Sequence, residues 1–502
     1  MERFISLVLL SLFLFFNNDG FFLEVDAAKR GTGTATRTPG GNLKFKLFHR
    51  HSPQFGKQGV NGTSLGLPRS KMERFRQLVF GDKGRLHTIS KKLAAADPER
   101  RRASEVKDFV ELPMRSAADF HIPQYFVSFR VGSPSKKFLL IADTAGILTW
   151  IQCRYKENTD SNVHEGRIFL PEKSRTFKPI PCSSEFCNKY ISYSYPMRPC
   201  NSPMALCSYD YSYEDGTRTI GIFGNDTVKI GLSGGKKIEM TDVLIGCSER
   251  TEGHRFEREK NINGVLGLGN NFHSFAYRGA KKFGNKFSYC LVDHTSPRNL
   301  VNYLVFGGID GSPLPNMQYT QLVFSFHNPF YGLNVSGISV NGTMLDIPSE
   351  IWDVNINSDG GTILDSGTSL TYMPKPVFDA VMEAFKAPLS KFKKVEIEWG
   401  GLGPEYCFND TGFEEWLMPK LVIHFADGAK LEPPVKSYVN EVDDNIRCLA
   451  FFTGDHGPMV IGNIMQQNHL WEFDLWEPRL GFAPSTCKLE NKKKSKKTNT
   501  EA

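Results

Sequence analysis

Two stretches decide the fold of this chain: FLLIADTA at residues 138–145 and GTILDSG at residues 361–367. Each is an apolar run typical of a buried strand. Each run ends in an aspartate, followed by a hydroxyl residue and then a very small one. The two aspartates, Asp143 and Asp365, stand 222 positions apart in the sequence. The repetition predicts two diverged copies of one structural unit.

A second motif repeats in the same order along the chain. An apolar-apolar-glycine triplet follows the first aspartate at residues 265–267, and another follows the second at residues 460–462. Turns rich in Gly, Asn, Asp and Pro separate the predicted strands, which lie at residues 125–131, 138–142, 243–246, 301–306, 331–340, 361–364, 420–425, 447–452 and 459–461. Helical periodicity is clearest at residues 376–385. We therefore expect a mostly β protein.

The paired aspartates suggest an acid–base site. A carboxylate at the end of a buried strand is costly unless it is paired or hydrogen-bonded. Two such groups brought together by a pseudo-two-fold cannot both ionise cheaply, so they share one proton. One member can then take a proton from a water while the other protonates a peptide carbonyl oxygen. This chemistry hydrolyses a peptide bond without a metal or a covalent intermediate, and we expect no cofactor.

The two ends of the chain differ in composition from its centre. The twelve-residue apolar run at residues 5–16 is too short to span a bilayer and predicts a signal peptide over residues 1–27. Residues 28–106 carry a net charge of +13, with a helix-like pattern from Lys71 to Ala96, and predict a basic propeptide. Residues 488–502, with a net charge of +4, predict a disordered tail.

The body between these segments is acidic. Residues 107–487 carry a net charge of −7, which argues against a nucleic-acid-binding body. A basic propeptide can dock on this surface electrostatically and leave when acid neutralises carboxylates. A processing site is expected near the run Arg100–Arg102, although an ordinary charged linker would look similar.

An ordered series of motifs resembles the pepsin-type aspartic proteases, in the plant nepenthesin-like branch. The series comprises residues 125–134, Asp143-Thr144, residues 148–153, Asp215-Gly216, residues 263–269, 287–290, 365–371, 461–464 and 479–484. The resemblance implies a bilobal fold, with two pseudo-symmetric β lobes and a cleft between them. The N-terminal lobe would span residues 107–315 and carry the first catalytic aspartate and the flap. The C-terminal lobe would span residues 316–487 and carry the second.

The resemblance also assigns roles to individual residues. Asp143 and Asp365 would be the catalytic dyad, Tyr213 the flap tyrosine and Trp150 its partner in the cleft wall. Both aromatic residues could instead have packing roles alone. The supporting loop residues would be Thr144, Ser366, Gly367 and Thr368. The hydroxyls of Thr144 and Ser366 are expected to donate across to the opposite loop, and the small residue that follows each lets a backbone N–H approach the carboxylate.

The first loop departs from the family pattern. The family usually has Asp-Thr-Gly-Ser-Asp, and this chain has DTAGI at residues 143–147. Ala145 adds a methyl group to a tight loop, and Gly146 removes a hydroxyl that would hydrogen-bond the first aspartate. An unsatisfied lone pair there costs ~1–3 kcal/mol. The fold is therefore a firmer expectation than full activity.

The ten cysteines are expected to form disulfides. Carry-over from the family pairs Cys182 with Cys207, Cys187 with Cys200, Cys290 with Cys487, and Cys407 with Cys448. The remaining Cys153 and Cys247 match positions whose usual partners this chain lacks, and we expect them to bond to each other. A zinc site at the clustered cysteines of residues 182–207 is the rival interpretation, and we expect no metal.

Two functions from different classes fit these features. The first is a secreted endopeptidase that acts on extended polypeptides at acidic pH. The second is a catalytically weakened binding or inhibitor protein on the same fold, directed for example against glycoside hydrolases. We expect no nucleic-acid partner and no transmembrane segment, a monomer, and an extracellular or apoplastic location with the vacuole as an alternative. The sequons predict glycosylation at Asn61, Asn225, Asn334, Asn341 and Asn409.

Overall fold

The structure is a computed structural model, and it describes most of the body together with part of the basic segment. The described residues are 71–72, 75–76, 78–79, 82–83, 85–86, 110–116, 125–155, 167–213, 217–231, 237–252, 262–293, 302–307, 316–324, 329–353, 360–397, 403–454 and 457–487. The predicted signal peptide, most of the propeptide including its processing site, Asn61 and the basic tail lie outside the described residues.

The first aspartate lies at the end of a strand in a four-strand motif. Strand β3 (Lys136–Asp143) pairs in parallel with β9 (Gly264–Gly267), so that Asp143 lies opposite Gly267. Strand β4 (Trp150–Gln152) runs antiparallel to β9 and parallel to β8 (Lys237–Glu252). Fully buried parallel strands need continuous apolar sequence, as residues 138–142 provide.

The second half repeats this motif strand for strand. Strand β16 (Thr362–Leu364) ends just before Asp365 and pairs in parallel with β25 (Met459–Ile461). Strand β17 (Thr371–Met373) runs antiparallel to β25 and parallel to β24 (Phe451–Thr453). The repeat predicted from the two aspartates and the two glycine triplets is therefore present in the strand pairing.

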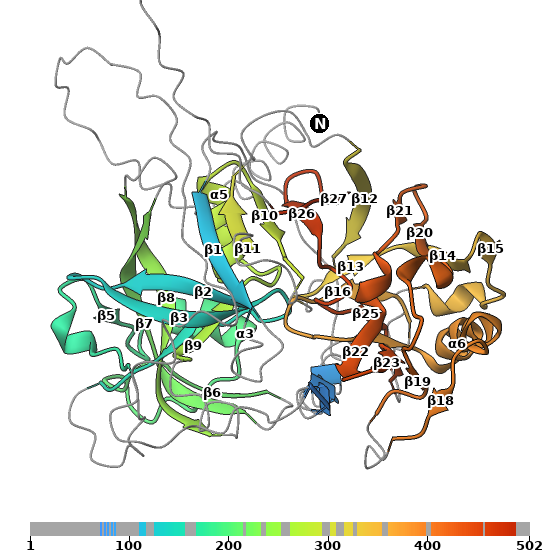
Figure 1. Cartoon of the computed structure of the whole chain (residues 1–502). Coiled ribbons are helices and arrows are strands. Elements are labelled where there is room, and N and C mark those ends of the chain that lie inside the picture. The colour runs from blue at the N-terminus through green and yellow to red at the C-terminus, as the bar shows by residue number, and fades with distance from the viewer. Residues whose placement is uncertain are drawn as a thin grey trace, which may run out of the picture. The chain divides into compact units, whose positions relative to one another are not determined.

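Strands from the middle and from the C-terminal end of the body join the two halves (Figure 1). Strand β10 (Lys286–Cys290) pairs with β26 (His469–Asp474), which pairs with β27 (Arg479–Pro484). Strand β11 (Asn302–Phe306) lies on the other side of β10, and β12 (Gln318–Val323) pairs with β27. The remaining strands are β1 (Val110–Ser116), β2 (Tyr125–Val131), β5 (Lys178–Pro179), β6 (Ser208–Ser212), β7 (Arg218–Gly231), β13 (Tyr331–Leu333), β14 (Val335–Val340), β15 (Thr343–Met344), β18 (Lys394–Val395), β19 (Cys407–Asn409), β20 (Leu421–Phe425), β21 (Lys430–Leu431), β22 (Val439–Asp443) and β23 (Ile446–Leu449).

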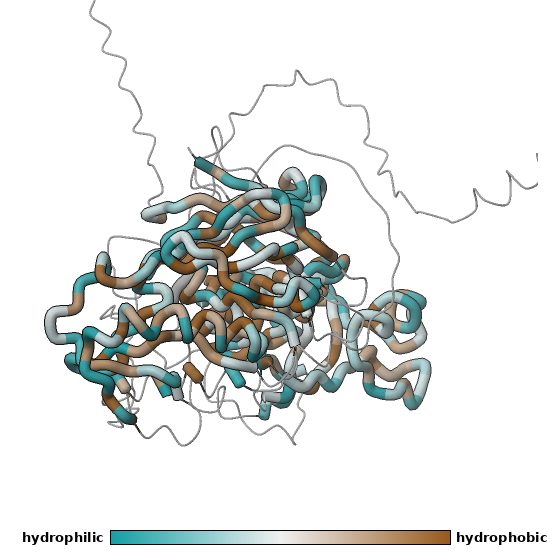
Figure 2. The backbone as a smooth tube through the Cα atoms, turned by 90° about the vertical axis from the view of Figure 1, so that its right-hand side faces the viewer, coloured by the Kyte–Doolittle hydropathy of each residue, from teal (hydrophilic) through white to brown (hydrophobic). Residues whose placement is uncertain are grey.

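Helices are few, as the sequence predicts. The longest, α6 (Lys375–Leu389), contains the predicted helical stretch and buries an apolar face that includes Val377, Val381 and Phe385. In the described part of the body the others are α5 (Phe275–Lys282), α3 (Ser192–Ser194) and short turns at η2 (Pro171–Lys173), η3 (Phe186–Ile191), η4 (Ser349–Ile351), η5 (Glu415–Leu417) and η6 (Val435–Ser437), and the described residues between 71 and 86 are helical as well. Apolar segments gather in the interior and polar segments on the outside (Figure 2). Among the described residues, no helix is long and apolar enough to cross a membrane.

Five disulfides join the ten cysteines. Cys290 bonds to Cys487, Cys407 to Cys448, and Cys153 to Cys247, whose Cα atoms lie 5.3 Å apart. The expected pairing of the other four is wrong. The structure joins Cys182 to Cys200 and Cys187 to Cys207, so these bridges interleave and are not nested. Cys187 lies in η3, and both it and Cys207 belong to one buried apolar cluster, which brings their sulfurs together.

Candidate active site

The two predicted catalytic aspartates lie together in matching loops. Asp143 is 3% exposed and Asp365 is fully buried. The amide of Ala145 donates to Asp143 Oδ1 (2.9 Å), and the amide of Gly367 donates to Asp365 Oδ1 (2.8 Å). Each carboxylate thus accepts the N–H two residues further on, because the small residue there lets the backbone come close.

The hydroxyl residues after the aspartates tie the two loops to each other. The amide of Ser366 donates to Thr144 Oγ1 (2.8 Å), and the amide of Thr144 donates to Ser366 Oγ (3.1 Å). The Ser366 hydroxyl donates in turn to the carbonyl of Ala142 (3.1 Å). Both hydroxyl oxygens therefore accept from the opposite loop, and the Ser366 hydroxyl also donates across to the opposite half, as expected. The two amide-to-hydroxyl hydrogen bonds between the loops hold the two carboxylates in matching positions.

The two loops differ at the third residue after each aspartate. The Thr368 hydroxyl donates to Asp365 Oδ2 at 2.5 Å. Gly146 occupies the corresponding place beside Asp143 and has no side chain to donate. A Cβ atom added at Gly146 would lie 2.8 Å from Asp143 Oδ2. The departure from the family pattern at Gly146 therefore lies directly beside the Asp143 carboxylate.

The glycines of the repeated triplets lie directly under these loops. A Cβ atom at Gly267 would lie 2.2 Å from the carbonyl oxygen of Ile147, and one at Gly462 would lie 2.1 Å from that of Leu370. Because real Cβ atoms do not approach backbone this closely, both positions require glycine. The glycine of each triplet therefore lets its strand pack closely against the backbone that follows the aspartate of the same half.

The predicted flap tyrosine contacts the predicted tryptophan. Trp150 is fully buried, and its Nε1–H donates to the hydroxyl oxygen of Tyr213 (2.8 Å). Burial raises the pKa of Tyr213 well above its usual range, and the charges of Tyr211 and Asp143 raise it further. Tyr213 therefore stays protonated, within reach of the charge of Asp143.

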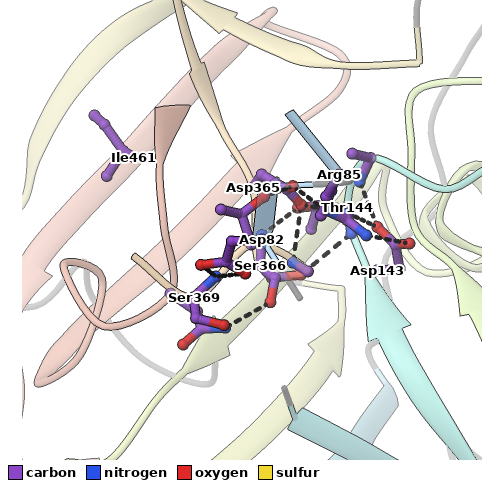
Figure 3. Close-up of polar contacts among 12 residues, drawn as sticks. Asp82, Arg85, Asp143, Thr144, Asp365, Ser366, Ser369 and Ile461 are labelled. Atoms are coloured by element: carbon purple, nitrogen blue, oxygen red, sulfur yellow. Dashed lines mark hydrogen bonds and ion pairs between the residues drawn. The ribbon is translucent and has the colours of Figure 1, made fainter. Parts of the chain in front are cut away.

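Arg85, from the basic segment, lies between the two carboxylates (Figure 3). Its Nη2 donates to Asp143 Oδ1 (2.5 Å) and to Asp365 Oδ1 (2.7 Å), and its Nε donates to Asp365 Oδ2 (2.5 Å). Burial lowers the pKa of this guanidinium, but the charges of Asp143 and Asp365 outweigh burial and leave its pKa above the usual value. A single planar cation thus binds both members of the dyad.

Asp82 anchors the same segment beside the second loop. Its carboxylate, 2% exposed, accepts from the amides of Ser369 (3.0 Å) and Leu370 (2.8 Å). Burial raises the pKa of Asp82 to about 7, against the lowering effect of these amides and of Arg85. Sequence reasoning missed both Asp82 and Arg85. No local motif marks them, because their partners are about 60 to 290 residues away.

No metal cluster is needed to explain the grouped cysteines. The sulfurs of Cys182, Cys187 and Cys200 lie within 4.8 Å of one another, but all three belong to the two interleaved disulfides. A disulfide sulfur is not the thiolate that zinc requires.

These features define a pepsin-like aspartic protease fold with both dyad aspartates present. Residues 125–308 match the family model described as xylanase inhibitor N-terminal, and residues 330–484 match its C-terminal counterpart. The chain is 32% identical over 375 residues to aspartyl protease family protein 2 of Arabidopsis thaliana, covering 72% of this chain and 71% of that one. It is 30% identical over 369 residues to aspartic proteinase nepenthesin-1 of Nepenthes gracilis, and the match covers 72% of this chain and 78% of that one. The chain belongs to the family of pepsin-like plant aspartic proteases that includes the nepenthesins.

The solved structures that share this fold include proteins that are not named as proteases. The protein edgp superposes with a TM-score of 0.61 at 19% identity, covering 77% of this chain and 97% of that one. The basic 7S globulin from soybean superposes with a TM-score of 0.59 at 18% identity, and the match covers 76% of this chain and 98% of that one. At these identities the likeness shows the fold alone. Activity therefore has to be argued from the residues of this chain.

Proposed function

We propose that this protein is a secreted aspartic endopeptidase that hydrolyses peptide bonds at acidic pH. The observation that carries the proposal is the pair of buried carboxylates, Asp143 and Asp365, close enough to share one guanidinium and tied together by Thr144 and Ser366. A decayed site would not need to keep both carboxylates, both cross-bonding hydroxyls and the flap tyrosine.

The chemistry follows from this arrangement. With Arg85 gone, the two carboxyls share one proton and hold a water between them. The ionised carboxyl removes a proton from the water as the water oxygen attacks the peptide carbonyl carbon, and the protonated carboxyl donates to the carbonyl oxygen, which gives a tetrahedral intermediate. The intermediate then collapses: the C–N bond breaks, the proton taken from the water passes to the leaving amine nitrogen, and the oxygen that was protonated returns its proton to the dyad. Tyr213 would close over an extended polypeptide from the flap, with its hydroxyl held by Trp150 in the cleft wall.

Residues 28–106 would act as an inhibitory propeptide. Arg85 occupies the place between the carboxylates where the water must sit, so hydrolysis requires its removal. The position of Arg85 supports a zymogen that is released in acid, where the carboxylates that hold it lose their charge.

Secretion and glycosylation belong to the same proposal. Five disulfides fit an oxidising compartment, in keeping with the predicted signal peptide. Among the described sequons, Asn334 and Asn341 are exposed and suited to carry glycans. Asn225 and Asn409 are half-buried, and the side-chain oxygen of Asn225 is fully covered. These two are poorer acceptors once the chain has folded.

The test is peptide cleavage by the purified full-length protein. We expect hydrolysis after incubation at pH 3–5, with a maximum well below pH 6 and inhibition by pepstatin, because the dyad must retain one proton. A pH optimum of cleavage near 8, or cleavage that pepstatin does not inhibit, would refute the two-aspartate mechanism.

A second candidate function is inhibition of a glycoside hydrolase. Two observations favour it: Gly146 leaves Asp143 without the hydroxyl that Asp365 has, and the matching family models are named for xylanase inhibitors. Xylanase activity measured with and without the protein tests this function. Xylanase inhibition without peptide cleavage at any acidic pH would favour it over the protease.

A further inference from the structure

Two fully buried tyrosines contact the surroundings of the aspartate loops and take no part in the proposed chemistry. Tyr289 lies in β10 and Tyr331 lies in β13. Both rings pack on Phe473 of β26, at centroid distances of 5.5 Å and 4.6 Å. We call residues 125–307, which carry the first aspartate, the first half, and residues 316–487, which carry the second, the second half. One tyrosine therefore comes from each half.

The hydroxyl of Tyr331, from the second half, reaches the backbone beside the first aspartate. It donates to the carbonyl oxygen of Leu268 (2.7 Å). The amide of the same Leu268 donates to the carbonyl oxygen of Asp143 (2.8 Å). Leu268 directly follows Gly267, which lies opposite Asp143 in the pairing of β3 with β9. A single residue thus joins Tyr331 to the backbone of the aspartate in the other half.

The hydroxyl of Tyr289, from the first half, reaches the second aspartate through one intermediate side chain. It donates to Oε1 of Gln466 (2.6 Å), a residue that is fully buried. Nε2 of Gln466 donates to the carbonyl oxygen of Ile461 (2.8 Å), and this oxygen also accepts the amide of Asp365 (3.2 Å). The two connections therefore cross, because each aspartate is joined to the tyrosine of the other half.

The direction of the hydrogen bonds through Gln466 follows from the chemistry of its neighbours. A carbonyl oxygen can only accept, so the amide nitrogen of Gln466 must face Ile461. The amide oxygen then faces Tyr289, whose hydroxyl has to donate. Burial raises the pKa of Tyr289 well above its usual range, and the charge of Asp365 raises it further. This hydroxyl therefore keeps its proton across the whole acidic range.

These bonds act on the backbone of the aspartate loops, so they can set where each carboxyl lies without touching the reacting atoms. We propose that Tyr289 and Tyr331 are positioning residues for the dyad, and that each holds the aspartate of the opposite half in place. The dyad shares a proton only while its two carboxyls stay close together, and support from the opposite half resists their separation. The effect on catalysis rests on the proposed function, whereas the crossed support of the loops does not.

Amide hydrogen exchange of the full chain tests the crossed support without any need for activity. Tyr331→Phe keeps the aromatic ring but leaves the Leu268 carbonyl without this donor, so exchange in residues 265–269 should become about tenfold faster. Tyr289→Phe should accelerate exchange in residues 362–367 by a similar factor. Mass spectrometry of peptides from the two regions measures both effects. Faster exchange only in the aspartate loop of the substituted half, or in neither loop, would overturn the proposal.

Tyr438→Phe is the matched control for the loss of a buried hydroxyl. The Tyr438 hydroxyl donates to the backbone carbonyl of Pro419 (2.8 Å), as Tyr331 does to Leu268, but its ring stacks on Phe451. All three single variants lose one buried hydrogen bond, so their thermal midpoints should fall by similar amounts. The control should leave exchange in both aspartate loops unchanged. Equal acceleration of the loops in all three variants would mean a general loss of stability and would refute the assignment.

Pairs of substitutions test whether Gln466 connects Tyr289 to the second loop. Gln466→Leu should accelerate exchange in residues 362–367, and adding Tyr289→Phe should accelerate it no further, because both changes break one connection. Tyr289→Phe combined with Tyr331→Phe breaks two connections, so both loops should exchange faster. Additive effects of Gln466→Leu and Tyr289→Phe in the second loop would show that the glutamine does not connect them.

The kinetics of peptide cleavage give a second measurement. Each tyrosine variant should lower kcat about tenfold with little change in KM, because the substitution disturbs the dyad and leaves the contacts with the rest of the peptide. The bell-shaped pH dependence of kcat/KM should also narrow. Carboxyls that lie further apart share a proton less well and repel each other less, so the lower apparent pKa of the dyad rises and the upper one falls. Tyr438→Phe should change neither kcat nor the pH profile.

The outcomes separate this proposal from the proposed function. Crossed effects on exchange in a protein that never cleaves peptides would leave the support of the loops standing and remove the protease. Cleavage whose kcat and pH profile are the same in the unchanged protein and in both tyrosine variants would keep the protease and remove the positioning role.

Discussion

The two dyad carboxylates are the residues on which the proposed activity depends most directly. Asp143→Asn and Asp365→Asn should each abolish peptide cleavage while leaving the protein folded, because an amide cannot exchange the shared proton. Cleavage of a peptide at pH 4, together with thermal unfolding, measures both effects. Asp379→Asn, on the exposed face of α6, is the control and should retain full activity. Near-normal turnover by either dyad variant would exclude the mechanism.

The first aspartate loop offers a gain-of-function test. Ala145→Gly with Gly146→Ser restores the usual family pattern. The new Cβ atom would lie 2.8 Å from Asp143 Oδ2, so this carboxylate has to shift slightly before the new hydroxyl can donate to it as Thr368 donates to Asp365. A hydrogen bond to a charged group contributes ~1.5–3 kcal/mol, so kcat should rise about tenfold to a hundredfold while KM changes little. Both constants are measured on one peptide. An unchanged kcat would mean that the loop has already adapted to Gly146.

At the scale of elements, the proposed flap residue Tyr213 is joined to Trp150 in β4 by a hydrogen bond. Tyr213→Phe removes the acceptor of the Trp150 N–H and should lower kcat/KM by about fivefold to tenfold, for a loss of ~1 kcal/mol. Tyr190→Phe, at a position that is 53% exposed, is the matched control and should have no effect. If both variants behaved alike, Tyr213 would be a packing residue only.

The elements themselves were largely predictable. Residues 125–131 and 376–385 were identified as strand and helix from their periodicity, and both lie where expected. The aspartate loops were also identified, because the apolar-strand, acid, hydroxyl, small-residue pattern is local. The donation by Ser366 to the opposite half was expected, but the bonds that the Thr144 and Ser366 oxygens accept from the opposite loop were not, because a hydroxyl can donate or accept and the geometry of that loop decides.

Long-range contacts were the part that sequence reasoning could not supply. The interleaving of Cys182–Cys200 with Cys187–Cys207 depends on how the chain turns through η3, which cysteine spacing does not encode. Arg85 is one of many basic residues in its segment, and only the folded structure shows that this residue contacts Asp143 and Asp365. Net charge predicted that the segment would dock, but not which guanidinium would reach the dyad.

At the scale of the whole molecule, the disulfides should differ in their effect on stability. Cys290 and Cys487 are 197 residues apart, whereas Cys182 and Cys200 are 18 apart. In the chain-entropy model, replacing the first pair with serines lowers the free energy of unfolding by about 5 kcal/mol, and replacing the second pair lowers it by about 3 kcal/mol. Denaturant unfolding of the two double variants measures the difference. A larger loss from the shorter loop would show that native packing outweighs chain entropy here.

The pairing of β10 with β26 also bears on how this protein is made. A ribosome delivers residues 286–290 long before residues 469–474, so β10 lacks this neighbour while the intervening chain is made. The central sheet can close only after residue 474 has emerged. A chain that stops between the two strands would leave one edge of β10 unpaired, and an unpaired strand edge favours aggregation.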